Sequence, residues 1–277
     1  MRHCLLLAGL VFAVYGQSAP YVFEVASVKQ AAPSSGPVRS SMRGGPGTSD
    51  PSQIAFTNVT LMNVLLRAYD VKSYQATGSD WLSSERYDIT AKIPPGATKE
   101  QFNFMLQNLL SDRFHLVLHH ETRQLQGYEL VTGKNAAKLK ASSETGPNVE
   151  PTTAPKIDAN GFPQLTAPGL VMMEGIRGKA VVSFLTARAQ PLSALAEQLS
   201  KEFRMPVLDK TGLTGRFDFT LEFAPEAPGA APADISDESA ANLISAVPQQ
   251  LGLKLDSKKI PVDVLVVDGA DKIPSEN

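Results

Sequence analysis

The chain contains two short stretches that are near copies of each other, RYDIT at residues 86–90 and RFDFT at residues 216–220. In both, apolar residues alternate with charged or hydroxyl residues, which is the pattern of a β-strand with one buried and one solvated face. A segment with apolar residues at helical spacing precedes each copy, and a second helical segment and more strands follow. We therefore expect one structural unit to occur twice, with four side chains buried at equivalent places: Tyr87, Ile89, Phe217 and Phe219.

The order of elements after each copy supports this duplication. A helix and two strands follow the first copy, the strands lying near residues 114–118 and 125–132. The same order follows the second copy, with strands near residues 251–255 and 260–267. A short polar segment separates the strands of each pair, so we expect both pairs to be hairpins. The second copy is longer, and an Ala/Pro-rich insert at residues 224–233 accounts for the difference.

Capping residues predict where the helices begin and end. Thr60 is suited to the N-cap of a helix, and Thr98 with Gln101 three residues later forms a capping-box pattern. Pro191 is suited to the first helical position. Another helix is expected to start near residues 235–236, and Pro248 should end or kink it about one residue earlier.

The predicted fold class is α+β, with two duplicated small lobes in 277 residues. Each lobe is expected to have a mainly antiparallel sheet covered by two helices. The expected division is a signal peptide at residues 1–16, a first lobe at 17–135, a linker at 136–168 and a second lobe at 169–277. The linker is inferred from a polar, proline-bearing composition with little periodicity.

The N-terminus has the order of a secretory signal. Basic Arg2 and His3 precede an apolar run at residues 4–14, and small residues follow, which favours cleavage after Gly16. A retained membrane anchor is the alternative, although the apolar run is short for a bilayer span. Cys4 is the only cysteine, so the mature chain would have no disulfide. We expect an exported protein, periplasmic or extracellular, with no stable membrane span after cleavage.

The overall charge argues against a nucleic-acid partner. The net charge is −2 and the isoelectric point is about 6.1. A protein that binds phosphate backbones normally has a broad electropositive surface. We therefore expect a protein, peptide or glycan of the cell envelope as the partner, of unknown identity.

Several motifs together resemble a known family. They are FEVASVK at residues 23–29, WL at 81–82, DRF at 112–114 with His119 and Glu121, and DKTGLTG at 209–215. This combination resembles a large paralogous family of exported acidobacterial proteins, the Solibacter type, a domain of unknown function. Similar domains occur attached to membrane zinc peptidases of the beta-lactam sensor class. The family has no assigned catalytic residues. More remotely, the repeated unit is similar in fold to the short N-terminal modules of secretins and TonB-dependent receptors.

Three histidines lie beyond the predicted signal peptide, and histidine is a common metal ligand and catalytic residue. On a strand, His115 and His119 would share one face and His120 would point to the other. The segment HETRQ at residues 120–124 resembles the zinc-peptidase motif, but Gln124 stands at the position of the second histidine. The motif also requires a helix to bring both histidines onto one metal, whereas this segment has a strand pattern. Exposed strand histidines are the simpler interpretation.

Two charged pairs could be catalytic carboxylates with their partners: Arg86 with Asp88, and Arg216 with Asp218. Because both recur on the solvated face of a strand, cross-strand charge pairs are favoured. The glycine-rich segment at residues 44–47 resembles a phosphate loop but lacks the Gly-Lys-Ser/Thr ending.

Trp81 is interpreted as a core residue at a strand entrance, with an exposed stacking role for a sugar or peptide as the alternative. The segment at residues 209–215 is interpreted as a turn in which both glycines adopt unusual backbone angles. Anion binding by its lysine and threonine is the alternative.

These observations assign no catalytic, cofactor-binding or metal-binding residue, and the binding residues stay unknown. We predict a non-catalytic binding, sensing or assembly module of the cell envelope. The alternatives are a hydrolase acting on cell-wall or peptide material, and a signalling partner of a membrane peptidase.

Overall fold

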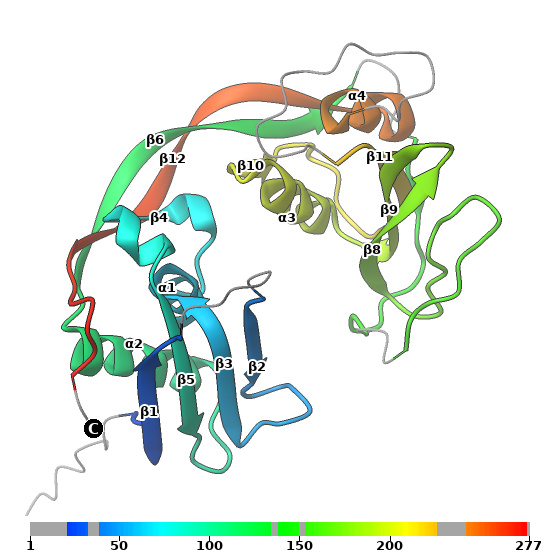
Figure 1. The fold of residues 1–277 in the computed structure, drawn as a ribbon. Coiled ribbons are helices and arrows are strands. Elements are labelled where there is room, and N and C mark those ends of the chain that lie inside the picture. Colours follow the sequence, from blue (N-terminus) through cyan, green and yellow to red (C-terminus); the bar gives the residue numbers. More distant parts are fainter. Residues whose placement is uncertain (1–20, 33–38, 134–137, 150–152, 226–241, 276–277) are drawn as a thin grey trace, which may run out of the picture. The chain divides into compact units, whose positions relative to one another are not determined.

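The computed structural model describes residues 21–32, 39–133, 138–149, 153–225 and 242–275 (Figure 1). The predicted signal peptide lies outside these residues. The chain is α+β and divides into two compact units. The first unit consists of Met1–Asp70, Gly78–Val117 and Val267–Asn277, and the second of Val71–Thr77 and Leu118–Val266. Within the described residues, no helix is long and apolar enough to cross a membrane.

The first unit contains a four-stranded antiparallel sheet in the order β1-β5-β3-β2 (Figure 1). Its strands are β1 (Val25–Gln30), β2 (Ser41–Gly44), β3 (Gln53–Thr60) and β5 (Arg86–Lys92). Its helices are α1 (Leu61–Tyr69) and α2 (Lys99–Phe114), and a short 3-10 turn at Asp80–Ser83 precedes β5. Both predicted helix caps are confirmed, at Thr60 and at Thr98 with Gln101.

The alternation predicted for residues 86–90 is present in β5. Tyr87 and Ile89 are fully buried, while Asp88 and Thr90 are exposed. On the side of the sheet that carries Tyr87, the two helices supply an apolar stripe. Its fully buried members include Leu61, Val64, Leu65, Phe102, Leu106 and Phe114.

The second unit contains a sheet with the matching order β7-β11-β9-β8. Its strands are β7 (Lys140–Ala141), β8 (Gly169–Arg177), β9 (Ala180–Gln190) and β11 (Phe217–Phe223). Helix α3 (Leu192–Phe203) begins just after Pro191, and α4 (Leu243–Ala246) leads into a π-helical turn at Val247–Leu251. The α-helical part therefore ends just before Pro248, as expected, whereas the predicted helix start at 235–236 lies outside the described residues. Phe219 is buried as predicted, whereas the prediction is wrong for Phe217, which is only partly buried.

A third sheet contains the long strands β6 (Val117–Thr132) and β12 (Leu253–Gly269), in the order β10-β6-β12-β4. Short β10 (Val207–Asp209) runs parallel to β6, and β4 (Ala76–Thr77) runs parallel to β12. The two predicted hairpins are therefore wrong, because each predicted pair of strands is one continuous strand. The polar segments predicted to be turns, residues 119–124 and 256–259, contain no glycine, proline or asparagine. Their polarity reflects exposure on a strand and not a change of direction.

Strand β3 ends in a bulge at Asn58, which has a left-handed backbone with φ of 56°. Asp88 Oδ1 accepts a hydrogen bond from the Asn58 N–H at 2.8 Å, and Arg86 Nη1 donates to the Asn58 carbonyl at 2.9 Å. The two charged side chains of β5 therefore hold both main-chain groups of one unusual residue, which redirects the chain into α1.

The same arrangement occurs in the second unit at Ala189, which has φ of 51°. Asp218 Oδ1 accepts from the Ala189 N–H at 2.8 Å, and Arg216 Nη1 donates to the Ala189 carbonyl at 2.9 Å. At these positions the predicted cross-strand charge pairs are replaced by bonds to the main chain. The repeated Arg-x-Asp pattern is a clamp on a bulge in both units.

This clamp predicts a stability effect in the second unit. Asp218→Ala should lower the free energy of unfolding by about 2 kcal/mol, because a charged acceptor is lost and alanine at position 189 is held in a strained conformation. Ala189→Gly in the same background should restore about 1 kcal/mol, since glycine adopts positive φ without that strain. Urea unfolding would measure both changes. Asp218→Asn, which keeps an acceptor oxygen, should lose less than Asp218→Ala; equal losses would contradict the clamp.

The last described residues pack within the first unit. Tyr87 Oη donates a hydrogen bond to the Lys272 carbonyl at 2.7 Å. The Asp271 N–H donates to the Phe114 carbonyl at 2.7 Å, and the Ser275 N–H donates to the Arg113 carbonyl at 2.8 Å. The C-terminal segment therefore covers the buried tyrosine of β5 and caps the end of α2.

Tyr87 makes the stability of the first unit depend on alkaline pH. Burial, with a smaller contribution from Glu85, raises the pKa of Tyr87 from 10.0 to about 12. The folded state therefore favours neutral tyrosine, and this stabilisation is complete below pH 10 and is lost as pH rises through 12. The free energy of unfolding should fall by up to about 3 kcal/mol across this window. Chemical denaturation of Tyr87→Phe should show a smaller fall; an unchanged fall would contradict this origin.

Candidate functional site

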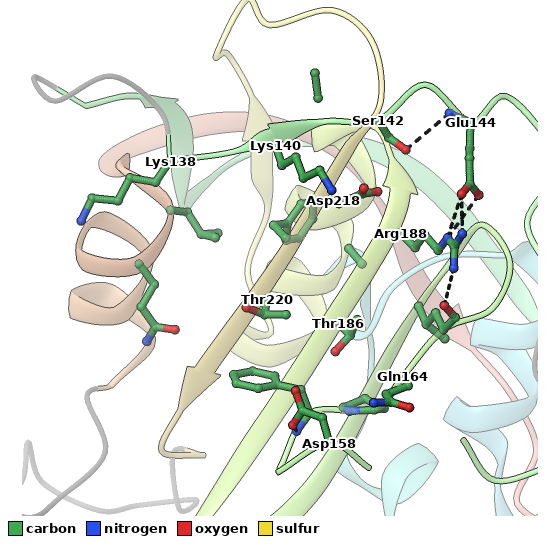
Figure 2. A pocket seen from close by; sticks show the side chains of 18 of the residues that line it. Lys138, Lys140, Ser142, Glu144, Asp158, Gln164, Thr186, Arg188, Asp218 and Thr220 are labelled. Carbon is green, nitrogen blue, oxygen red and sulfur yellow. Dashed lines mark hydrogen bonds and ion pairs between the residues drawn. The ribbon is translucent and has the colours of Figure 1, made fainter. Parts of the chain in front are cut away.

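A pocket of about 740 Å³ lies on the sheet of the second unit, on the face turned away from α3 (Figure 2). Alternation along β9 and β11 determines its floor. Leu185 and Leu221 point into the core with α3. Their neighbours point the other way, and four of them line the pocket: Thr186, Arg188, Asp218 and Thr220.

The chain between β7 and β8 covers this face, and we call its described residues, 142–149 and 153–168, the strap. Arg188 holds the strap at two places. Its Nε donates to Glu144 Oε1 at 3.0 Å, and its Nη1 donates to the Leu165 carbonyl at 2.7 Å (Figure 2). The hydrogen bonds and the negative charge of Glu144 raise the pKa of Arg188 above its ordinary value. One guanidinium therefore fastens the beginning and the end of the strap to the sheet.

A second side chain of β9 also binds the strap. Gln190 is 1% exposed, and its carboxamide exchanges two hydrogen bonds with that of Asn148, at 2.8 and 3.2 Å. The Val149 N–H donates to the Pro168 carbonyl at 2.8 Å. These bonds satisfy a buried amide and fix the part of the strap next to β8.

The far wall of the pocket is a turn with its own fixed shape. Asp158 Oδ1 accepts from the N–H groups of Asn160 and Phe162, at 2.9 and 2.8 Å. Phe162 packs edge-on against Phe184 of β9, with ring centroids 5.2 Å apart. Arg177 lies 5.2 Å over the Phe184 ring and donates to the Asn160 carbonyl at 2.8 Å. The turn is therefore anchored to the sheet by an aromatic contact and a cation.

The lining combines charges, hydroxyls and amides. Lys140, Thr220 and Gln164 lie around the opening in Figure 2. The Thr186 hydroxyl oxygen is buried and has no hydrogen-bond partner among the described residues. A buried hydroxyl without a partner costs free energy. The pocket can therefore offer both donors and acceptors to a polar molecule of moderate size.

Among the described residues, the equivalent face of the first unit lacks the side chains that hold the strap in the second unit. The residues that flank the bulge are Thr57 and Val59 in β3, where β9 has Arg188 and Gln190. The chain between the first two strands is also much shorter, at residues 31–40. Within the described residues, the side chains that hold a strap occur in the second unit.

The structure places the three histidines apart from this pocket. His115 ends α2 with φ of 47° and its Nδ1 lies 2.8 Å from Asp271 Oδ2. The prediction that His115 and His119 share a strand face is therefore wrong, because only His119 and His120 lie on β6. His120 Nδ1 lies 2.8 Å from Asp263 Oδ2 on β12. In the described part of the chain, no group of three or more His, Cys, Asp or Glu residues could hold a metal ion.

Trp81 and the glycine-rich segment have structural surroundings. Trp81 is partly buried, and Lys272 Nζ lies 5.8 Å from the centre of its ring. Gly44 and Gly45 have positive φ, and the Gly45 N–H donates to the Gln53 carbonyl at 3.0 Å. The glycines thus form the turn that joins β2 to β3.

The segment at residues 209–215 is a turn, as predicted. Asp209 Oδ1 accepts from both the N–H and the hydroxyl of Thr211, at 3.0 and 2.7 Å. Gly212 and Gly215 have φ of 69° and 103°. The threonine is occupied in shaping the turn that leads to β11.

A smaller pocket of about 380 Å³ lies in the first unit between residues 22–26 and α2. Phe23, Met105 and Leu109 contribute apolar walls, and Asp112 and Arg113 lie at its border. Among the described residues, none forms a cover over it comparable to the strap.

Sequence reasoning missed the strap pocket because it interpreted residues 136–168 as a linker. The structure differs in two respects: contacts group the chain with the second unit from Leu118 onward, and the strap is bonded to that unit's sheet. One signal was present. A long irregular segment inside a compact domain is usually either a functional loop or a linker, so a functional loop was one of two interpretations open. Arg188 and Glu144 carry no motif that would have paired them.

The fold and the site together define an α+β protein of two compact units, the second of which carries a polar pocket covered by the strap. The family model described as Protein of unknown function (DUF3738) matches residues 62–270. The chain belongs to this family, and the match includes both copies of the clamp strand and the whole strap. No curated protein and no solved structure matches the chain significantly. The resemblance to exported acidobacterial proteins stays a prediction.

Proposed function

We propose that this protein is an exported, non-catalytic binding module of the cell envelope, and that its ligand binds in the strap pocket. The observation that carries the proposal is the fastening of the strap by Arg188. A segment held at both ends over a sheet keeps a polar pocket of about 740 Å³ preformed. Preformed pockets of this size are typical of sites for small molecules.

The bonds of the pocket carboxylates favour binding over hydrolysis. Glu144 is occupied by Arg188, Asp158 by two backbone N–H groups, and Asp218 by the Ala189 N–H. A general acid or base must exchange a proton with the substrate, whereas these carboxylates serve as acceptors that hold the chain. A hydrolase would therefore need a general acid or base other than these three carboxylates.

We also propose that the two units arose by duplication and then diverged in role. The support is the same strand order, the same bulge and the same pair of clamp bonds in both units. In this interpretation the first unit keeps the ancestral sheet, and the strap is the feature by which the second unit acquired a binding function.

Amide chemical-shift mapping tests the proposed binding. Short sugars and short capped peptides would be added to the ¹⁵N-labelled chain, with expected shifts at Thr186, Thr220 and Gln164. Thr220→Val should weaken binding without loss of stability, because valine removes an exposed hydroxyl of the pocket lining. Release of cleaved product, or shifts confined to the first unit, would contradict the proposal.

A further inference from the structure

The register of the sheet arranges the floor of the strap pocket in rows. Lys140 of β7 is paired with Asp218 of β11, and Thr220 of β11 is paired with Thr186 of β9. Side chains of directly paired residues point to the same face of a sheet, with Cβ atoms about 5 Å apart. All four residues line the pocket. A row with a cation and a carboxylate therefore lies directly beside a row of two threonines.

Polar groups also form the opposite end of the pocket. In Figure 2, Asp158 and Gln164 lie at one end, and Lys140 and Asp218 lie at the other. The turn that carries Asp158 is anchored on Phe184, which is paired with the residue four positions beyond Asp218 on β11. Four strand residues span about 13 Å. The pocket is therefore long enough for a short chain of linked rings, with polar side chains at both ends.

The charges of the lining cancel. Among the described residues, three cations and three carboxylates line the pocket: Lys138, Lys140, Arg188, Glu144, Asp158 and Asp218. Arg188 and Glu144 form an ion pair. An anion that approached Lys140 would meet Asp218 one strand away, and a cation at Asp218 would meet Lys140. Like charges at such distances repel, so a charged ligand gains little from either group.

Hydroxyl groups match a lining of this kind. A hydroxyl donates one hydrogen bond and accepts others, so one ligand hydroxyl can donate to a carboxylate and accept from an ammonium group at the same time. Other accessible side chains of the lining also suit hydroxyls, because Thr220 and Ser143 are exposed alcohols and Gln164 is an exposed carboxamide. The pocket therefore favours a neutral ligand with many hydroxyl groups.

The place of the pocket on the sheet disfavours a peptide strand. Extended peptides bind at a sheet edge, where main-chain N–H and C=O groups are available. The floor contains β9, which is paired with β11 on one side and with β8 on the other. This strand therefore offers its side chains and not its main chain to a ligand. Phe162 adds an aromatic side chain to the lining, against which the C–H groups of a sugar ring can pack.

We propose that the strap pocket binds a neutral oligosaccharide, which lies along β9 and β11 beneath the strap. The inference rests on the proposed binding function and specifies its ligand class. At one end, a sugar hydroxyl accepts from Lys140 and donates to Asp218. Thr220 binds a hydroxyl in the middle, and Asp158 and Gln164 bind hydroxyls at the other end. The balance of charges in the lining selects against acidic and basic sugars.

The test compares three β-1,4-linked trisaccharides that differ in charge. Cellotriose is neutral, the trimer of glucosamine has an ammonium group in place of one hydroxyl on each ring, and the trimer of glucuronic acid has a carboxylate on each ring. Titration of the ¹⁵N-labelled full chain in mildly acidic buffer should move the Thr220 and Gln164 amide resonances with cellotriose. Both charged trimers should bind at least about tenfold more weakly, because each brings a like charge next to a lining group.

Lys140→Glu changes the balance of charges at one end of the pocket. It leaves two cations against four carboxylates in the lining, so the glucosamine trimer should bind at least about tenfold more tightly than it binds the unchanged chain. Lys179→Glu makes the same change of charge in the β8–β9 turn, outside the lining, and should leave the three affinities unchanged. Amide resonances of the core report whether each variant is folded.

The outcomes separate this inference from the proposed function. Equal affinity for the three trimers, or the same gain for the glucosamine trimer in Lys179→Glu, would overturn selection by the lining charges while leaving the pocket as a binding site. Binding of N-acetyl-alanine methylamide in the pocket without binding of cellotriose would identify a peptide ligand and overturn the sugar assignment. If none of these probes moves a pocket resonance, the proposed function fails as well.

Discussion

Replacing Gly127 by alanine should lower the free energy of unfolding of the second unit by about 3 kcal/mol or more. Gly127 lies in β6 where β10 approaches most closely, next to the hydrogen bond from the Tyr128 N–H to the Pro206 carbonyl. A Cβ atom at Gly127 would overlap that carbonyl oxygen and would lie 2.9 Å from Ile260 Cδ1. A main-chain obstacle cannot be relieved by a rotamer change, so β6 and β10 would have to separate.

Gly146→Ala provides a matched control. At that position in the strap, an added Cβ meets the Pro168 ring at 3.6 Å, an ordinary van der Waals distance. Its effect should stay within about 0.5 kcal/mol. Both variants would be compared with the unchanged chain by urea unfolding. A Gly127→Ala variant as stable as Gly146→Ala would show that β10 is not held against β6 as described.

Arg188→Ala should release the strap and remove ligand binding in its pocket. The substitution breaks the bonds to Glu144 and to the Leu165 carbonyl together. The Glu144 carboxylate then has no cation within reach in the strap. We expect amide hydrogen exchange in residues 153–165 to accelerate at least about tenfold, because a local opening becomes easier while the core of the sheet is unchanged. Trypsin should also cleave after Lys156, the one basic residue of the strap.

Two variants control for charge and for geometry. Lys179→Ala removes a cation from the β8–β9 turn, outside the pocket lining, and should leave exchange in the strap unchanged. Arg188→Lys keeps the charge but cannot bond to Glu144 and to the carbonyl at once, so it should behave more like the alanine variant. If Arg188→Lys protects the strap fully, charge and not the two-point attachment holds it.

Local features of the fold could be predicted because their causes lie within a few residues. The alternation at residues 86–90 determines which side of β5 is buried, and the caps at Thr60 and Thr98 depend on bonds across three positions. The third sheet could not be predicted in this way. Its pairs join β4 to β12 and β10 to β6, elements that are far apart in the sequence, and no local pattern specifies a partner.

The candidate site was missed for a related physical reason. Arg188 lies near the end of β9, but its partners Glu144 and Leu165 lie in a segment without periodicity. The repeated Arg-x-Asp pattern was visible, yet its meaning depended on a left-handed residue at Asn58 or Ala189. Neither asparagine nor alanine requires that conformation, so the sequence alone did not reveal the bulge.

The C-terminal segment has a consequence for the order in which the chain becomes structured. Tyr87 donates a hydrogen bond to the Lys272 carbonyl, and the N–H groups of Asp271 and Ser275 bind carbonyls at the end of α2. The first unit therefore combines segments that are far apart in the sequence. Contacts of such large sequence separation form late and slow folding. A nascent chain that has emerged only as far as α2 still lacks the cover for its buried tyrosine. The first unit therefore cannot finish folding until residues 271–275 have been synthesised.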